Sequence, residues 1–361
     1  MVSNYRLPVV TLKDLRVEEV CPIFERINSS GTRLSTYDLM VAATWSQHFN
    51  LNDEAKVIRT ALTRKGFGDV DGDTILKCLA AVKVGSVKNS DITGLRDIRD
   101  KNTMDGLVAK TKEAMLKAVD LLTTEFKILS WDFLPYEALI VVLTRIFSVR
   151  TALNSQQVKR VRQWFWRAAI SERYRVGGEA FVSKDIAKVS DFVLNGAGTP
   201  ESFGDVPADG TWAKAPFRAN NSKSRAFVLM LAQLQPRNIT NGTAIDVDVA
   251  LSAWNKREFH HVHPRAYLES IGEPLEHNAI ANICMLAASQ NKLVSDSDPK
   301  QYLPTCAGAL GTQAELVFES NLLPSPLGSF QYSTANYEMF LAARCELIGE
   351  LARKLCNGNA Q

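Results

Sequence analysis

The sequence predicts a mainly α-helical protein that carries one small strand–loop–strand–helix (ββα) element in its C-terminal third. Residues 51–195 show apolar positions at helical spacing throughout, which predicts a helical domain. Residues 258–263 and 279–287 are typical of two short strands, and residues 289–303 fit a helix that is interrupted near Pro299. We therefore expect a helical domain followed by a ββα domain within a helical surround.

Length and composition set the domain organisation. The chain has 361 residues, of which 46% are hydrophobic, so a prior of about 100–200 residues per domain suggests two or three domains. No apolar run reaches the roughly 18–20 residues of a membrane span, and residues 1–6 lack the form of a signal peptide. We expect a cytoplasmic protein with no membrane partner. Its segments are 1–50, the end of a preceding domain; 51–200, helical; 201–245, linker or loop; and 246–361, the ββα domain with a closing helix.

Charge and cysteine usage exclude some classes. The net charge of +3 does not by itself indicate a nucleic-acid-binding protein. The six cysteines are scattered and include no Cys-x-x-Cys pair. This spacing favours buried, reduced thiols and argues against a structural zinc site.

The N-terminal region predicts a strand, a helix and a capped second helix. Residues 5–12 are typical of a short edge strand, and residues 17–28 have helical spacing. Ser35 and Asp38 form the pattern of a capping box, so a helix is expected to begin there.

The helical middle contains one basic helix with two interpretations. Residues 109–122 have one apolar face, residues 131–147 are nearly all apolar and predict a central buried helix, and residues 156–174 are amphipathic and basic. Basic residues interleaved with aromatic residues can hold a nucleic-acid backbone. Alternatively, the aromatic residues belong to the core and the arginines form a solvated face, which we favour. The candidate DNA-binding residues of this helix are Arg160, Arg162 and Arg167.

The region before the ββα domain predicts a loop, a helix and a turn. Residues 199–221 are rich in Gly, Pro, Ala and Asp, which predicts a loop or linker. Residues 222–233 favour a helix, and residues 238–243 a polar turn.

Histidines and carboxamides cluster in residues 258–303. The chain has five histidines, and four of them are His260, His261, His263 and His277. Asn282 lies 21 residues after His261, and Asn291 follows nine residues later. A strand, a loop, a second strand and a helix with this spacing resemble the ββα-metal hairpin of HNH nucleases.

This segment resembles the HNH nuclease domain of the GmrSD-type modification-dependent restriction endonucleases. That family reads roughly H-H-I-F-P-K-A-Y-L, N-x-I-A-N-L, N-x-x-I-S and P-x-x-Y-L, and this chain reads HHVHPRAYL, NAIANI, NKLVS and PKQYL in the same register. The matching segments are 260–268, 278–283, 291–295 and 299–303.

The resemblance extends to both ends of the chain. Residues 23–35 resemble the family's F-x-R-I-N-x-x-G-x-x-L-S segment, and residues 337–355 resemble its closing helix, with the F-L-x-x-R element at residues 340–344. The family couples a ParB-like nucleotide-hydrolysing domain to a C-terminal HNH domain. The nucleotide domain's Asp-Gly-Gln-Gln-Arg motif does not occur in this sequence. We therefore expect no NTP site here, residues 1–50 to be the end of the ParB-like domain, and an NTPase domain or subunit to be a partner outside this chain.

Phosphodiester cleavage explains the residue types of the motif. Such cleavage needs an activated water and neutralisation of the charge that grows on the phosphate. His261 fits the general base, since an imidazole pKa near 6.5 suits proton transfer close to neutrality. The resemblance implies His260 and Asn291 as metal ligands, and we expect Asn282 to hydrogen-bond the backbone of the histidine strand. Arg265 and Lys292 are candidates for phosphate contacts.

The expected cofactor is a divalent metal ion. Two neutral ligands leave positions for water and phosphate oxygens, which suits Mg²⁺, and the imidazole also suits Mn²⁺, Ni²⁺ or Zn²⁺. His263 departs from the family, which usually has an apolar aromatic residue there. It either supplements the site or is packed, and we favour packing.

Two functions remain open at this stage. The first is a metal-dependent HNH endonuclease that nicks or cleaves double-stranded DNA, including modified or phage DNA, in bacterial antiviral defence. The second is a non-catalytic DNA-binding or assembly module that uses the basic helix. Metal-independent DNA binding that survives loss of His261 would distinguish the second from the first.

Overall fold

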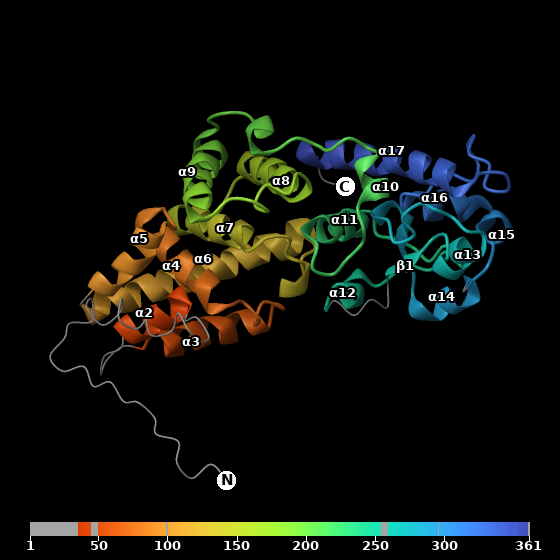
Figure 1. The fold of residues 1–361 in the computed structure, drawn as a ribbon. Helices are drawn as coiled ribbons and strands as arrows, with labels where there is room; N and C mark the ends of the chain where they lie inside the picture. Colours follow the sequence, from red (N-terminus) through yellow and green to blue (C-terminus); the bar gives the residue numbers. More distant parts are fainter. Residues whose placement is uncertain (1–34, 45–49, 99, 254–258, 295, 360–361) are drawn as a thin grey trace, which may run out of the picture.

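The protein is mainly helical, as the sequence predicts (Figure 1). The computed structural model describes residues 35–44, 50–98, 100–253, 259–294 and 296–359. The strand expected at residues 5–12 and the helix expected at 17–28 lie outside the described residues, as does nearly all of the motif at 23–35. Among the helices described, none is long and apolar enough to cross a membrane.

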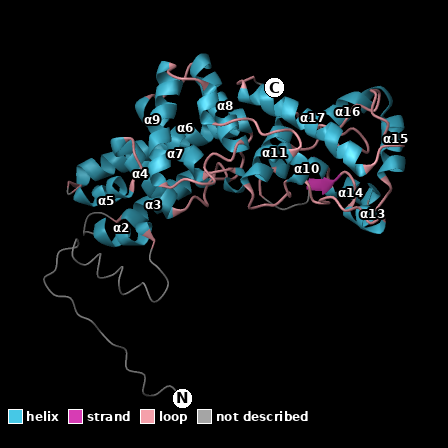
Figure 2. Ribbon diagram, turned by 45° about the horizontal axis from the view of Figure 1, so that its top comes forward, coloured by secondary structure: helices cyan, strands magenta, loops and turns pink. Residues whose placement is uncertain are grey.

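The first part of the described chain is a run of helices joined by short turns, gathered at one end of the molecule (Figures 1 and 2). These elements are α2 (Thr36–Thr44), α3 (Leu51–Thr63), α4 (Gly72–Val84), α5 (Asn89–Thr93), η2 (Gly94–Asp97), α6 (Lys101–Phe126), η3 (Trp131–Phe133), α7 (Glu137–Val149), α8 (Ser155–Ile170) and α9 (Glu179–Asn195).

Local sequence signals account for several helix starts. At α2, the Asp38 amide donates to Ser35 Oγ and the Ser35 amide donates to Asp38 Oδ2, which is the expected capping box. Asn154 and Gln157 form a second capping box at α8. The helix expected at residues 131–147 begins only at Glu137, because the residue before Pro135 is held extended.

The second part of the chain carries the small sheet and the closing helix. Its elements are η4 (Pro200–Phe203), α10 (Thr211–Lys214), α11 (Ser222–Gln233), α12 (Val247–Ala250), β1 (Phe259–His261), α13 (Arg265–Ser270), η5 (Ile280–Asn282), β2 (Ile283–Met285), α14 (Ala288–Val294), α15 (Pro299–Leu310), η6 (Gly311–Gln313), α16 (Ala314–Glu319) and α17 (Tyr337–Cys356).

Both strands are shorter than expected. The strand expected to reach residue 263 ends at His261, and the strand expected to begin at residue 279 begins at Ile283. The reason for the second difference is the 3₁₀ turn η5, which occupies the residues just before β2. The helical interruption near Pro299 is real, because α14 ends at Val294 and Pro299 starts α15, where a missing amide hydrogen costs least.

One hydrophobic core runs through both parts of the molecule. It includes residues from Met40 to Cys356 as a single cluster. The closing helix α17 packs against α8 of the first part and against α10 and η5 of the second (Figure 1). The segment expected to be a linker contributes to this core, since Trp212 and Phe227 are fully buried.

Candidate active site

The sheet places the adjacent histidines in a fixed register. β1 pairs antiparallel with β2, so that His260 lies opposite Cys284 and His261 lies opposite Ile283. Since side chains alternate along a strand, His260 and His261 leave β1 on opposite faces. His261 shares its face with Phe259, whose ring lies 5.8 Å from that of Phe217.

Asn282 is a buried anchor for the chain that follows β1. Its side chain is fully buried, and its Nδ2 donates to the carbonyls of His263 (3.0 Å) and His277 (2.9 Å). Its Oδ1 accepts from the His263 amide at 2.8 Å. Both N–H groups and the oxygen of the Asn282 carboxamide therefore bond backbone atoms. Asn282 thus fixes the conformation of the hairpin.

His261 is bonded to a carboxamide that the sequence had given no role. Its Nε2 lies 3.0 Å from Asn278 Oδ1, and Asn278 Nδ2 donates to the Phe217 carbonyl at 2.6 Å. A carbonyl can only accept, so the Asn278 nitrogen must face Phe217 and its oxygen must face His261. His261 Nε2 then carries the proton, and in the neutral ring Nδ1 holds the lone pair.

The surroundings of His261 keep its ring neutral. Burial lowers the pKa of His261, and the nearby charges of His260, Arg265 and His277 lower it further, against an opposing contribution from the Asn278 hydrogen bond. At neutral pH the imidazole is therefore unprotonated at Nδ1 and able to accept a proton.

The two expected metal ligands lie on different elements. His260 is half-buried on β1, and Asn291 is half-buried on α14, which starts three residues after the end of β2. A carboxamide oxygen such as that of Asn291 is a ligand type that hard divalent ions accept. An imidazole nitrogen and a carboxamide oxygen fit a divalent ion that keeps several waters. No group of three or more His, Cys, Asp or Glu side chains that could hold a metal ion occurs in the described part of the chain.

His263 is packed, as we favoured from the sequence. Only 5% of the residue is exposed, and its ring lies 4.4 Å from that of Phe340 and 5.1 Å from that of Tyr337. Because β1 ends at His261, the alternation that would put His263 on the face of His261 does not continue. Burial lowers the pKa of His263 to about 3, and its Nδ1 finds no hydrogen-bond partner among the described residues.

The expected phosphate contacts are exposed near the hairpin. Arg265 starts α13 and pairs with Glu269 at 2.7 Å, with 69% of its side chain exposed. Lys292 lies exposed on α14. An exposed ion pair of this kind contributes about 0–1 kcal/mol, so a phosphate can replace Glu269 at small cost.

A buried arginine of α17 donates hydrogen bonds to the backbone around Asn282. Arg344 is fully buried and donates to the carbonyls of Ala281 (2.9 Å), Asn321 (3.0 Å), Leu322 (3.2 Å) and Ile283. Two of these carbonyls flank Asn282 in the chain. Burial lowers the pKa of Arg344 to about 10, so the guanidinium stays charged and is balanced by carbonyl dipoles.

The predicted DNA-binding arginines of the basic helix α8 make ion pairs and hydrogen bonds with other parts of the chain. Arg162 pairs with Glu125 at 2.5 Å, Arg167 pairs with Glu201 at 2.9 Å, and Arg160 Nη1 donates to a backbone carbonyl at 3.4 Å. The aromatic residues Trp164, Phe165 and Trp166 are at most 1% exposed and offer no face to a base. This geometry supports the packing interpretation of the helix.

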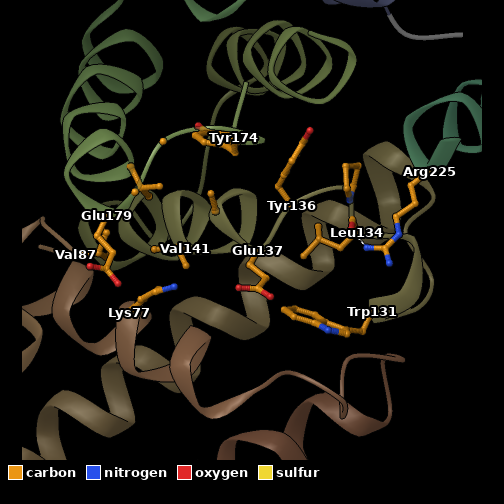
Figure 3. Close-up of a pocket in the computed structure, with 15 residues that line it drawn as sticks. Lys77, Val87, Trp131, Leu134, Tyr136, Glu137, Val141, Tyr174, Glu179 and Arg225 are labelled. Carbon is orange, nitrogen blue, oxygen red and sulfur yellow. Dashed lines mark hydrogen bonds between the residues drawn. The ribbon is translucent and has the colours of Figure 1, made fainter. Parts of the chain in front are cut away.

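A polar pocket of about 600 Å³ lies among the helices of the first part (Figure 3). Trp131, Tyr136 and Tyr174 contribute aromatic surfaces, and Lys77 extends toward Glu137. Glu137 is exposed as a whole residue. Partial burial and the nearby Asp71 nevertheless raise the pKa of its carboxyl group. None of the residues predicted for the nuclease site lines this pocket.

Sequence reasoning missed three contributors to the site. Asn278 appeared only as a matching letter of the family motif, and Arg344 only as the last letter of F-L-x-x-R. Phe217 acts through its backbone carbonyl, which leaves no signal in residue type. The motif matches could have drawn attention to the first two, but their partners depend on tertiary contacts.

Comparison with known proteins adds little to this geometry. No family model matches the chain. An uncharacterized protein of Methanocaldococcus jannaschii is 24% identical over 321 residues, which cover 84% of this chain and 53% of that protein. The chain thus spans about half the length of this curated relative.

Proposed function

We propose that this protein is a metal-dependent endonuclease of the HNH type, which hydrolyses phosphodiester bonds of double-stranded DNA. The observation that carries the proposal is His261. It lies on a two-stranded hairpin that is followed by a short helix, and its Nε2 is engaged by Asn278, so that Nδ1 carries the lone pair that can accept a proton. A neutral, half-buried imidazole fixed in this way has the protonation state of a general base.

The proposed mechanism gives each residue a separate task. His261 Nδ1 takes a proton from the attacking water, and Asn278 keeps the opposite nitrogen protonated. Asn282 holds the backbone between His263 and His277, which keeps the hairpin rigid. Arg265 and Lys292 bind flanking phosphates, which positions the scissile bond.

A divalent ion would be held by His260 and Asn291. When bound, it supplies positive charge against the phosphate and the leaving oxygen. Mg²⁺ is our first choice, with Mn²⁺, Ni²⁺ or Zn²⁺ as alternatives that an imidazole ligand also accommodates.

We also propose a place for the protein in defence against foreign DNA. This rests on the resemblance to GmrSD-type proteins, in which an NTP-hydrolysing domain controls cleavage of modified DNA. The partner in this proposal is an NTPase domain or subunit that acts on the HNH site. We do not extend the proposal to DNA binding by α8, because its arginines are engaged within the protein.

A plasmid-nicking assay tests the endonuclease. We expect wild-type protein to convert supercoiled DNA to the open circular form with Mg²⁺ or Mn²⁺, and we expect His261→Ala to be slower by about 10²–10⁴-fold, the usual contribution of a general base. His277→Ala is the matched control, because among the described residues the His277 ring bonds the Glu273 carbonyl, and this variant should leave nicking close to wild type. Equal nicking by wild type and His261→Ala, or none by either with any of the four metals, would refute the proposal.

A further inference from the structure

We infer that Asn278 is a positioning residue that holds His261 in a single tautomer, and that residues 215–217 set the orientation of Asn278. The inference deepens the proposed function by assigning control of its general base to the segment before α11. Its consequence for rate rests on the proposed nuclease activity, whereas its consequence for the tautomer does not.

The first step is the pairing of residues 215–217 with the loop before β2. The Phe217 amide donates to the Asn278 carbonyl at 2.7 Å, and the Ile280 amide donates to the Ala215 carbonyl at 2.8 Å. Pro216 and Ala279 lie between them in an antiparallel bridge. Together with the 2.6 Å bond from Asn278 Nδ2 to the Phe217 carbonyl, three hydrogen bonds join the two segments.

The second step is the rigidity of residues 215–217. They directly follow α10, whose Trp212 is fully buried and which packs against α17 and η5. The Phe217 ring lies 5.8 Å from that of Phe259, which in turn lies 6.1 Å from that of Phe133 in the helical part. The Phe217 carbonyl is therefore held from both sides, and it presents a fixed acceptor to Asn278.

The third step is the effect on His261. A neutral imidazole exchanges its proton between two nitrogens unless a partner selects one. The Phe217 carbonyl turns the Asn278 oxygen toward His261 Nε2, and that oxygen selects the Nε2–H form. Partners of this kind, one step removed from the chemistry, typically change activity by roughly 10–100-fold when they are removed.

Nitrogen NMR of the imidazoles tests the inference without DNA or metal. The 361-residue chain has five histidines, so selective ¹⁵N-histidine labelling gives few signals, and His261→Ala assigns the one of interest. In wild type, measured at a pH where the ring is neutral, we expect His261 to show the limiting shifts of the Nε2–H tautomer and a slowly exchanging Nε2 proton.

The variants separate positioning from a merely structural role. Asn278→Leu removes the acceptor, so we expect averaged tautomer shifts, fast exchange of the proton, and a kcat for nicking that falls roughly 10–100-fold with little change in KM. Asn278→Asp retains an acceptor, and we expect it to keep the Nε2–H form. Gln290→Ala on α14 is the control, because among the described residues its side chain bonds Thr240, and it should leave the His261 signals unchanged. If the leucine variant does not fold, Asn278→Ala carries the same expectation.

The outcomes distinguish this inference from the endonuclease proposal. A single Nε2–H tautomer with a slowly exchanging proton in the folded Leu or Ala variant would overturn the inference, whatever happens to nicking. Averaged shifts in that variant, together with a wild type that never nicks DNA, would support the positioning role and reject the nuclease.

Discussion

At the scale of single residues, His263 lies in a buried environment that disfavours its charged form. His263 packs against two aromatic rings of α17, and in the described part of the chain its Nδ1 has no hydrogen-bond partner. Burial lowers its folded pKa to about 3, whereas an unfolded chain has the ordinary histidine pKa of about 6.5. Between about pH 3 and pH 6.5, His263 is therefore mostly protonated in the unfolded state and mostly neutral in the folded state.

This difference predicts acid sensitivity that one substitution removes. As pH falls below about 6.5, the unfolded state gains stability by protonation, so the free energy of unfolding should drop by about 1.4 kcal/mol at pH 5.5 from His263 alone. His263→Phe, which keeps an aromatic ring against Phe340 and Tyr337, should lose this part of the pH dependence. Urea denaturation at about pH 7.5 and pH 5.5 measures it. The same drop in wild type and variant would assign the sensitivity to other groups.

Residue types in the motif were more predictable than their partners. The sequence identifies His261, Asn282 and Asn291 as a set because imidazoles and carboxamides recur at fixed spacing. It does not reveal Asn278 or the Phe217 carbonyl, because one lies in an irregular loop and the other is a backbone atom from a segment 61 residues away. A hydrogen bond of this kind depends on how distant segments dock.

At the scale of elements, the buried Arg344 side chain joins α17 to the sheet by hydrogen bonds. Arg344 supplies hydrogen bonds to four carbonyls, two of which flank Asn282. Removing it would leave several buried acceptors without donors, and each such acceptor costs about 1–3 kcal/mol.

We expect Arg344→Met to lower the free energy of unfolding by about 3 kcal/mol or more, measured by urea denaturation. Arg344→Lys should restore only part of the loss, because an ammonium lacks the planar fork that reaches separate carbonyls. Arg353→Met is the matched control on the same helix. Arg353 has a half-exposed ion pair with Asp209, so its loss should cost less than about 1 kcal/mol. Similar losses for both Met variants would contradict this view of α17.

Helices could be predicted well and strands poorly, for a physical reason. Periodicity over many residues identifies α8, α11 and α17 with errors of a few residues, whereas the segment predicted at 109–122 covers only the inner part of α6. The strands are three residues each, too short for alternation to define their ends, and a 3₁₀ turn replaces the start of the second. The late start of α7 follows from Pro135, a local signal that the apolar run concealed.

At the scale of the whole molecule, one core joins the helical part to the site. α8 packs against both α9 and α17, and α11 packs against α8. The arginines of α8 belong to this framework, because Arg162 links α8 to Glu125 on α6 with about a quarter of each side chain exposed.

Arg162→Ala should therefore weaken folding and leave DNA binding unchanged. We expect the free energy of unfolding to fall by about 1 kcal/mol or less, and the urea midpoints followed by helical circular dichroism and by the His261 imidazole signal to move together. Lys159→Ala, an exposed neighbour on the same helix, should change neither. A DNA-binding salt slope that falls by about 0.9 in Arg162→Ala would instead reveal a phosphate contact at α8.

The buried guanidinium of Arg344 also sets an order of events during synthesis. Its bonds to the carbonyls of Ala281 and Ile283 span 63 and 61 residues of sequence. A nascent chain thus carries the histidines and Asn282 for some time before the donor that completes their backbone has been made. Contacts of such long range form late and slowly, so the histidine hairpin should stay incompletely folded on the ribosome until α17 has emerged and docked.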